Sequence, residues 1–367
     1  MVRIFASPSR YIQGKDVFPN ANIYIQDLGD KPLLLCDSVV WNIIGDKVYN
    51  NLKDNDFDVV HVEFGGEASD EEASRVEKIA KENSSNVILG LGGGKTVDAA
   101  KKVAYDLGLK VVSMPTTAST DAPCSALSVM YHEDGTFKDY SFYKKNPDLV
   151  LIDTAVVANA PVRTLIAGIG DAMATNVEAL DVAQGHNQSM VHGQQTLAAM
   201  AIAQTCMDNL FAHSKQAISS AKAGVASEPL ETIVEANTLL SGLGFESAGL
   251  AAAHAIYDAF TVLDGDIEKM MHGEKVAYGT LCELILDNAP EEKMNKFIDF
   301  YQSVGLPTTL EDLHIADVTS EDLLRVGQQA TIPSETIHNM PFEVSSQDVA
   351  DSIRAVNEYV VSYNLNK

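Results

Sequence analysis

The chain has 367 residues, of which 7% are aromatic and 21% charged, and its 26 basic and 51 acidic side chains give a net charge of −25. At about 150 residues per domain this length predicts two domains, and the composition is typical of a folded rather than a disordered chain. The acidic surplus excludes a nucleic-acid partner, because binding a polyanion requires basic side chains that neutralise its phosphates.

Residues 1–160 alternate short apolar runs with helical patterns. The apolar runs, rich in Val, Leu and Ile, predict buried strands at Pro32–Cys36, Val59–Phe64, Val87–Leu91, Val111–Met114 and Leu149–Ile152. Helical periodicity lies between them, as in Glu71–Glu82 and Val97–Leu107. The turn Asp134-Gly135 between two β-prone runs predicts a small antiparallel hairpin. This alternation predicts an α/β domain with a parallel Rossmann-like sheet and helices on both faces.

The pattern changes after residue 160. From Pro161 onward the sequence shows helical periodicity and Ala-rich stretches such as Leu197–Gln204 and Leu250–Ala259. We therefore predict an α/β domain over residues 1–160 and an all-α domain over residues 161–367. The second part carries 28 acidic and 10 basic side chains against 23 and 16 in the first. A nucleotide site is thus expected in the first domain and a divalent cation in the second.

The compartment is predicted from what the sequence lacks. Residues 1–13 contain no apolar stretch typical of a secretory signal. The longest uncharged run, Val182–Met207, contains several Gln, Asn and His residues and is too polar to span a bilayer. The four cysteines form no C-x-x-C pair, which argues against structural zinc and a redox site. We therefore expect a cytoplasmic protein with no membrane partner.

A glycine-rich turn joins a predicted strand to a predicted helix in the segment Asn86–Asp98. Backbone N–H groups of such a turn, together with the helix N-terminus, can bind a phosphate. The P-loop pattern fails because position 89 is Leu, and the usual dinucleotide fingerprint fails because position 95 is Lys. The alternative is a strand–helix turn that binds nothing.

A second polar run, Pro115–Ser125, follows the next predicted strand. It would lie at the carboxyl end of a parallel sheet, where α/β proteins bind ligands. Its hydroxyl groups and Asp121 are candidates for contacts to ribose, phosphate or substrate. The alternative is a turn with a helix cap.

Three residues of the helical domain are candidate metal ligands. His254 lies in an apolar helical context, His272 opens the next predicted helix, and Asp171 is expected at a helix start after a glycine turn. Two imidazoles and one carboxylate would leave one coordination position open, as in catalytic zinc or ferrous iron sites. In the alternative, His254 is a hydrogen-bonded core histidine and the other two are helix caps.

The spaced motifs resemble the metal-dependent, iron-containing-type alcohol dehydrogenase family over essentially the whole chain. They are Gly92–Asp98, Pro115–Pro123, Gly168–Ala172, Gly242–Ser247, His254 and His272–Lys275. The resemblance implies a dehydroquinate-synthase-like architecture, with an NAD-binding α/β domain over 1–160 and a helical metal-binding catalytic domain over 161–367.

The resemblance also implies site residues. Those matching cofactor positions are Asp37, Gly94, Lys95, Asp98, Thr116, Ser119, Ser125, Leu127 and Tyr131. A carboxylate at Asp37 would accept from a ribose 2′-hydroxyl and repel a 2′-phosphate, which favours NAD over NADP. The metal ligands implied are Asp171, His254 and His272, and with Asp121 they form the catalytic and substrate-contacting set. The expected metal is Zn²⁺, with Fe²⁺ or Mn²⁺ as alternatives.

The activity implied is NAD-dependent, reversible oxidation of the small polyol glycerol to dihydroxyacetone by a homo-oligomer, with an octamer as one form. The alternatives are another vicinal diol such as 1,2-propanediol, a small hydroxy acid, or a catalytically inactive nucleotide-binding or scaffold protein. Tyr257 and Asp258 stand where the family commonly carries His and Asn, and Asn176 stands where an aromatic is frequent. These departures leave the substrate open.

Overall fold

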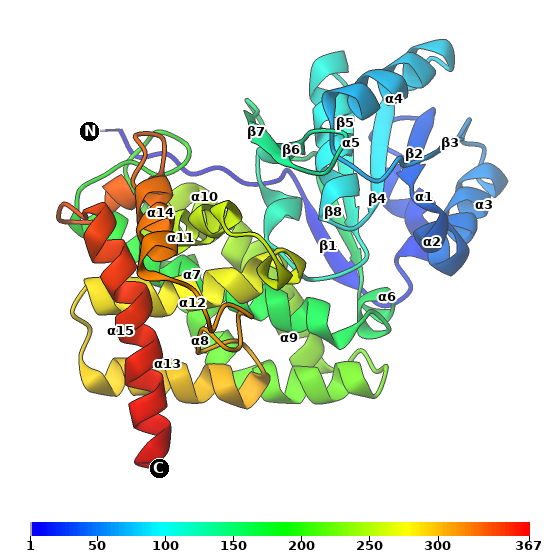
Figure 1. Cartoon of the computed structure of the whole chain (residues 1–367). Helices are drawn as coiled ribbons and strands as arrows, with labels where there is room; N and C mark the ends of the chain where they lie inside the picture. The colour runs from blue at the N-terminus through cyan, green and yellow to red at the C-terminus, as the bar shows by residue number, and fades with distance from the viewer. Residues whose placement is uncertain (1) are drawn as a thin grey trace. The chain divides into compact units, whose positions relative to one another are not determined.

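The computed structural model describes residues 2–367, apart from the side chain of Phe137, and the chain forms two compact units (Figure 1). Ala6–Pro161 and Ser219–Gly242 form an α/β unit. Val162–Ile218, Leu243–Lys367 and the N-terminal residues up to Phe5 form a helical unit. The expected division after residue 160 lies beside the boundary at Pro161, but it does not include the return of Ser219–Gly242 to the α/β unit.

Hydrogen bonds explain this return. Glu231 accepts from the Gln13 side-chain amide at 2.7 Å and from the Thr154 hydroxyl at 2.5 Å. The Asn237 amide donates to the Ala118 carbonyl oxygen at 2.9 Å. Such long-range side-chain contacts leave no periodic trace in a sequence, so a simple two-part division was the expectation.

A six-stranded parallel sheet in the order β1-β8-β5-β4-β2-β3 forms the centre of the α/β unit. Its strands are β1 (Tyr11–Gly14), β2 (Pro32–Cys36), β3 (Val60–Glu63), β4 (Val87–Gly92), β5 (Lys110–Pro115) and β8 (Leu149–Asp153). The predicted hairpin is confirmed as the antiparallel pair β6 (Leu127–Tyr131) and β7 (Phe137–Phe142). The five predicted strands are confirmed, whereas the half-buried edge strand β1 was missed because it has no continuous apolar run.

Side-chain alternation along the strands supplies two cores, one on each face of the sheet. In β2, Leu34 and Cys36 belong to one core and Leu33 and Leu35 to the other. Apolar residues of α1 and α3 complete the first core, and those of α4 and α5 complete the second. The helices of this unit are α1 (Ala21–Ile25), α2 (Ser38–Val40), α3 (Asp46–Asp54), α4 (Asp70–Glu82), α5 (Gly94–Leu107), α6 (Thr154–Ala158) and α9 (Glu228–Glu235).

The helical unit is built around α12 (His272–Leu286), which packs against α7 (Val162–Gln184), α11 (Ala252–Ala259) and α15 (Ser346–Leu365). Figure 1 shows α15 as the red helix that carries the C-terminus. The remaining helices are α8 (Leu197–Lys222), α10 (Ser241–Ala248), α13 (Glu291–Val304) and α14 (Ser320–Ala330). The prediction of helical structure after residue 160 is confirmed.

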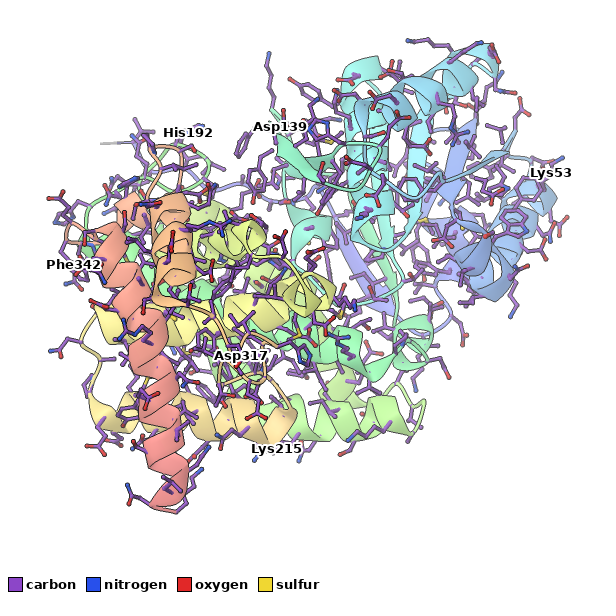
Figure 2. All side chains as sticks on the ribbon, in the orientation of Figure 1. Lys53, Asp139, His192, Lys215, Asp317 and Phe342 are labelled. Carbon is purple, nitrogen blue, oxygen red and sulfur yellow. The ribbon has the colours of Figure 1, made fainter. Side chains whose placement is uncertain are left out.

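Charged side chains such as Lys53 and Asp317, both labelled in Figure 2, are exposed to solvent. The four cysteines are instead buried as free thiols: Cys36, Cys124, Cys206 and Cys282. Burial raises the pKa of the Cys36 thiol to about 12. No single helix within residues 2–367 has the length and apolarity needed to cross a membrane. The segments Glu228–Ala248 and Ala252–Val262 reach that length and apolarity only when they are counted together, and the chain bends by 101° between them.

Candidate functional site

Three ligand atoms, one each from Asp171, His254 and His272, lie within 4.8 Å of one another in the helical unit. The Asp171 Oδ1 atom is 2.9 Å from His272 Nε2 and 3.4 Å from His254 Nε2. Two ligands held at about 2.1 Å by a tetrahedral zinc ion lie about 3.4 Å apart, so these separations fit a metal centre. One carboxylate and two imidazoles suit zinc or ferrous iron, and three protein ligands leave a position for substrate.

Asp171 lies inside α7, and the prediction that it begins a helix after a glycine turn was wrong. The neighbouring glycines are helical, and they serve the packing of α12 against α7. A Cβ on Gly170 would lie 2.3 Å from the Gly273 carbonyl oxygen, and a Cβ on Gly273 would lie 1.8 Å from the Ala167 carbonyl oxygen. Both glycines are therefore required for an approach that brings Asp171 beside His272.

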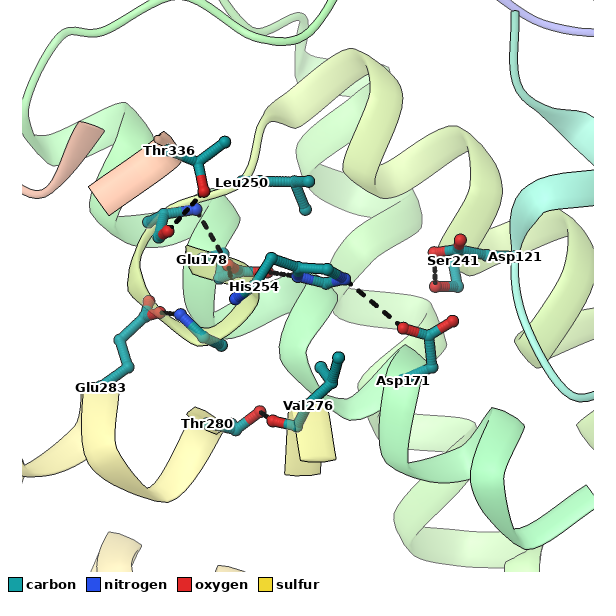
Figure 3. A network of polar contacts seen from close by, with 12 residues as sticks. Asp121, Asp171, Glu178, Ser241, Leu250, His254, Val276, Thr280, Glu283 and Thr336 are labelled. Carbon is teal, nitrogen blue, oxygen red and sulfur yellow. Dashed lines mark hydrogen bonds and ion pairs between the residues drawn. The ribbon is translucent and has the colours of Figure 1, made fainter. Parts of the chain in front are cut away.

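His254 is held from both sides in the first turn of α11. Its Nε2 atom faces Asp171, and its Nδ1 atom is 2.6 Å from Glu178 Oε2 (Figure 3). The Asp171 and Glu178 side chains are buried, with 1% and 0% exposed. His254 is thus a hydrogen-bonded core histidine, as one alternative proposed, and it also lies within reach of a metal.

The charges of this cluster stabilise one another. Burial alone would raise the pKa of the Asp171 carboxyl, but His272 and His254 outweigh it and hold that pKa well below its ordinary value. Burial alone would lower the pKa of His254, but Glu178 and Asp171 raise it well above its ordinary value. A site that favours ionised carboxylates is suited to a cation.

Tyr257 lies one helical turn after His254, and its ring edge meets the His272 ring with centroids 4.2 Å apart. The Lys275 ammonium lies 5.2 Å from the centre of the same tyrosine ring. Tyr257 therefore borders the candidate metal centre. Asn176 is buried in α7, five residues after Asp171.

Five candidate cofactor residues of the α/β unit follow the carboxyl ends of β2, β4 and β5 along the chain: Asp37, Gly94, Lys95, Thr116 and Ser119. Asp37 follows β2 and caps α2, accepting from the Val39 and Val40 amides at 2.8 and 2.9 Å. The turn after β4 enters α5 with no side-chain cap, and a Cβ on Gly93 would meet nothing within 4 Å. The N-terminus of α5 thus offers backbone N–H groups beside open space, as phosphate binding requires.

Lys95, in the first turn of α5, is paired with an acidic neighbour. Its ammonium lies 2.5 Å from Glu67 Oε2 and 4.6 Å from the centre of the Tyr131 ring. The Thr116 amide donates to the Gly92 carbonyl oxygen at 3.0 Å, which places the polar run beside the glycine-rich turn. Ser119 extends the same loop, with its hydroxyl 3.2 Å from that of Thr117.

Asp98 has an interior position. Its carboxylate is 2.9 Å from the Lys101 ammonium and accepts from the Val129 amide at 3.2 Å, and Asp98 and Lys101 are 4% and 2% exposed. Lys101 also donates to the carbonyl oxygens of Ala122 and Leu127. The pair therefore fixes the loop that carries Leu127 and the fully buried Ser125, whose hydroxyl donates to Ala122 at 3.1 Å.

Asp121 lies in the α/β unit and accepts from the Ser241 hydroxyl at 2.7 Å (Figure 3). The structure thus groups the candidate residues into two sets: the three metal ligands in the helical unit, and Asp121 with the cofactor positions in the α/β unit.

The charged side chains that contact the candidate site residues were not identified from the sequence. Glu178 follows Asp171 by seven residues, two turns on the same helix face, and this spacing was a usable signal. Asp98 and Lys101 are three residues apart on one face of α5, so this pair was also recoverable from its spacing. Glu67 and Glu283 gave no comparable signal, because their contacts join segments far apart in the sequence.

Comparison with known proteins places these features in a family. The model of the iron-containing alcohol dehydrogenase family matches residues 8–154. Glycerol dehydrogenase 1 of Schizosaccharomyces pombe is 45% identical over 97% of this chain and 79% of its own length. Glycolaldehyde reductase of Halobacterium salinarum is 40% identical over 98% of both chains. A crystal structure of glycerol dehydrogenase from S. pombe superposes with a TM-score of 0.97 at 44% identity, covering 99% of this chain and 92% of that one.

Proposed function

We propose that this chain, which belongs to the iron-containing alcohol dehydrogenase family, is an NAD-dependent glycerol dehydrogenase that interconverts glycerol and dihydroxyacetone. The observation that carries the proposal is the convergence of Asp171, His254 and His272 in a chain 45% identical to a glycerol dehydrogenase. An enzyme acting on another vicinal diol or on a hydroxy acid has less support from these relatives. A catalytically inactive protein is disfavoured because all three ligands are in place.

Asp171, His254 and His272 would hold the metal, which we propose to be zinc. Bound zinc would polarise the substrate hydroxyl and bound NAD would accept the hydride. Asp171 supplies the negative charge of the centre, and its burial excludes water from one side. His254 and His272 would supply nitrogen ligands from separate helices, α11 and α12.

The α/β unit would bind NAD at the edge formed by β2, β4 and β5. The uncapped N-terminus of α5, with Gly94 and Lys95, suits a pyrophosphate. Asp37 would accept from the adenosine ribose and reject a 2′-phosphate. We assign Thr116, Ser119 and Tyr131 to the same cofactor edge, and Asp98, Ser125 and Leu127 to the support of its loop. We assign Asp121 to substrate contact.

We also propose a cytoplasmic homo-oligomer, with an octamer as one form. Four buried free thiols are consistent with a reducing compartment. Sedimentation velocity on the purified protein would measure the oligomeric state.

The first experiment is NADH formation from glycerol and NAD, followed by ultraviolet absorbance, before and after chelation and zinc re-addition. Activity should disappear with the chelator and return with zinc. Asp171→Asn should abolish turnover while NAD affinity stays within about twofold, because the carboxylate lies in the helical unit. Substantial turnover by a metal-free Asp171→Asn protein would refute the assignment.

A substrate panel then ranks the alternatives. Glycerol, 1,2-propanediol and small hydroxy acids are compared by kcat/KM in the oxidative direction, and dihydroxyacetone and glycolaldehyde in the reductive direction. We expect glycerol and dihydroxyacetone to lead. Retained zinc and NAD binding with no turnover of glycerol would direct attention to Tyr257 and Asp258.

A further inference from the structure

Glu178 lies behind the proposed metal ligand His254, on the side opposite Asp171 (Figure 3). Its side chain is fully buried, and its Oε2 atom is 2.6 Å from His254 Nδ1. We propose that Glu178 is a positioning residue that selects the His254 tautomer, placing the proton on Nδ1 so that Nε2 is free to bind the metal. The inference rests on the metal centre proposed above.

The argument follows from the hydrogen-bonding capacity of a carboxylate. An ionised carboxylate only accepts, so the ring nitrogen that faces Glu178 must carry a proton. In a neutral imidazole the other nitrogen then has the lone pair. That nitrogen is Nε2, which faces Asp171. A metal ligand held in this way by a carboxylate is both oriented and made more basic.

The backbone prevents Glu178 from turning away. Its second oxygen, Oε1, accepts from the Ala251 amide at 2.9 Å and from the His254 amide at 3.0 Å. These two N–H groups lie at the start of α11, where a helix has no internal acceptors for its own amides. Glu178 therefore binds the backbone and the ring of the same histidine, and fixes its side chain relative to the helix.

Glu283 is a natural control for the capping part of this role. It is also fully buried, and it accepts from the Ala253 amide at the same end of α11 at 2.6 Å. Burial and the nearby Glu178 and Asp181 carboxyls raise the pKa of Glu283 well above its ordinary value. Glu283 therefore shares the burial and the helix capping of Glu178, while Glu178 is the one that holds the ring of His254.

Glu178→Gln keeps nearly the same side-chain volume and separates the two roles of Glu178, which are capping the α11 amides and holding the proton on His254 Nδ1. The two amides of α11 require an acceptor, so the glutamine oxygen should take the place of Oε1. Its NH₂ group then faces His254 Nδ1 and donates to it, which moves the ring proton to Nε2. A protonated Nε2 cannot bind a metal, so we expect zinc affinity to fall about 10- to 100-fold.

The measurement is zinc affinity of the full-length metal-free protein by competition with a chromophoric chelator, together with circular dichroism. Wild type and Glu283→Gln should bind zinc equally, and Glu178→Gln should bind it 10- to 100-fold more weakly with unchanged helix content. Wild-type affinity in Glu178→Gln, or an equal loss in both variants, would refute the tautomer role. If Glu178→Gln does not fold, Glu178→Asp against Glu178→Asn makes the same comparison, with Asp expected to bind more tightly.

The outcome for wild type separates this inference from the proposed function. A wild-type protein that binds no zinc refutes the metal centre and the inference with it. A wild-type protein that binds zinc, beside a Glu178→Gln variant that binds it equally well, refutes the inference and leaves the proposed dehydrogenase intact.

Discussion

Gly273→Ala tests whether the close approach of α7 and α12 sets the geometry of the metal centre. Gly273 directly follows His272, and a Cβ on it would lie 1.8 Å from the Ala167 carbonyl oxygen and 2.9 Å from the Asp171 amide nitrogen. Real Cβ atoms essentially never show contacts under 3.0 Å. The two helices would therefore have to separate by about 1.2 Å at this point.

This displacement is large on the scale of the site. Added to the 2.9 Å between His272 Nε2 and Asp171 Oδ1, it gives about 4 Å, beyond the roughly 3.4 Å that separates two ligands of tetrahedral zinc. Over-packing of this kind destabilises a protein by about 1–3 kcal/mol. We expect a zinc affinity at least about tenfold weaker, since 1.4 kcal/mol corresponds to that factor.

The assay combines a chelator-competition zinc titration with thermal unfolding of the metal-free protein. Gly327→Ala is the matched control, because its Cβ would lie 2.0 Å from the Ser346 carbonyl oxygen, where α14 contacts α15. Neither of these helices contributes a proposed metal ligand. Both variants should unfold at lower temperature, and Gly273→Ala alone should bind zinc more weakly. Equal zinc affinity in Gly273→Ala and wild type would refute the reasoning.

Three further predictions concern buried or paired charges. Lys101→Met should destabilise the protein by about 3–5 kcal/mol in urea titrations, because it leaves Asp98 as an unpaired buried carboxylate, and adding Asp98→Asn should recover part of the loss. Burial raises the pKa of Asp181 from 3.8 to about 6, so the folded protein loses stability as pH rises through that range and the buried carboxyl ionises. Asp181→Asn has no such carboxyl, so its melting temperature should rise relative to that of wild type over the same pH interval. Glu67→Gln should free the Lys95 ammonium and tighten NAD binding by at most about fivefold in fluorescence titrations, and weaker binding would contradict this.

The sheet was predictable because its strands are buried on both faces. Continuous apolar runs such as Pro32–Cys36 match the observed strand from end to end. The edge strand β1 has four half-buried residues, including Gln13 and Gly14, and gives no such run. The helical character of the second half followed from periodicity, but the return of Ser219–Gly242 to the α/β unit depends on side-chain bonds such as that of Glu231.

The metal ligands could be proposed from residue type and family resemblance, but their surroundings could not. Glycines before Asp171 indicated a turn, whereas their physical role is to let two helices touch. A short-range sequence signal cannot distinguish these cases, because both require a residue without a Cβ. Glu178 was recoverable from its spacing, while Glu283 caps α11 through a backbone amide that any residue except proline would supply at position 253.

The four buried thiols can report local unfolding, because they become accessible to alkylation only when the structure around them opens. Each unit holds two of them: Cys36 and Cys124 in the α/β unit, and Cys206 and Cys282 in the helical unit. A thiol without solvent access and with a raised pKa, as Cys36 has, resists alkylation until its surroundings open. Alkylation followed by peptide mass spectrometry would thus time the opening of each unit separately. Equal labelling rates would mean one cooperative block, and unequal rates would identify the unit that opens first.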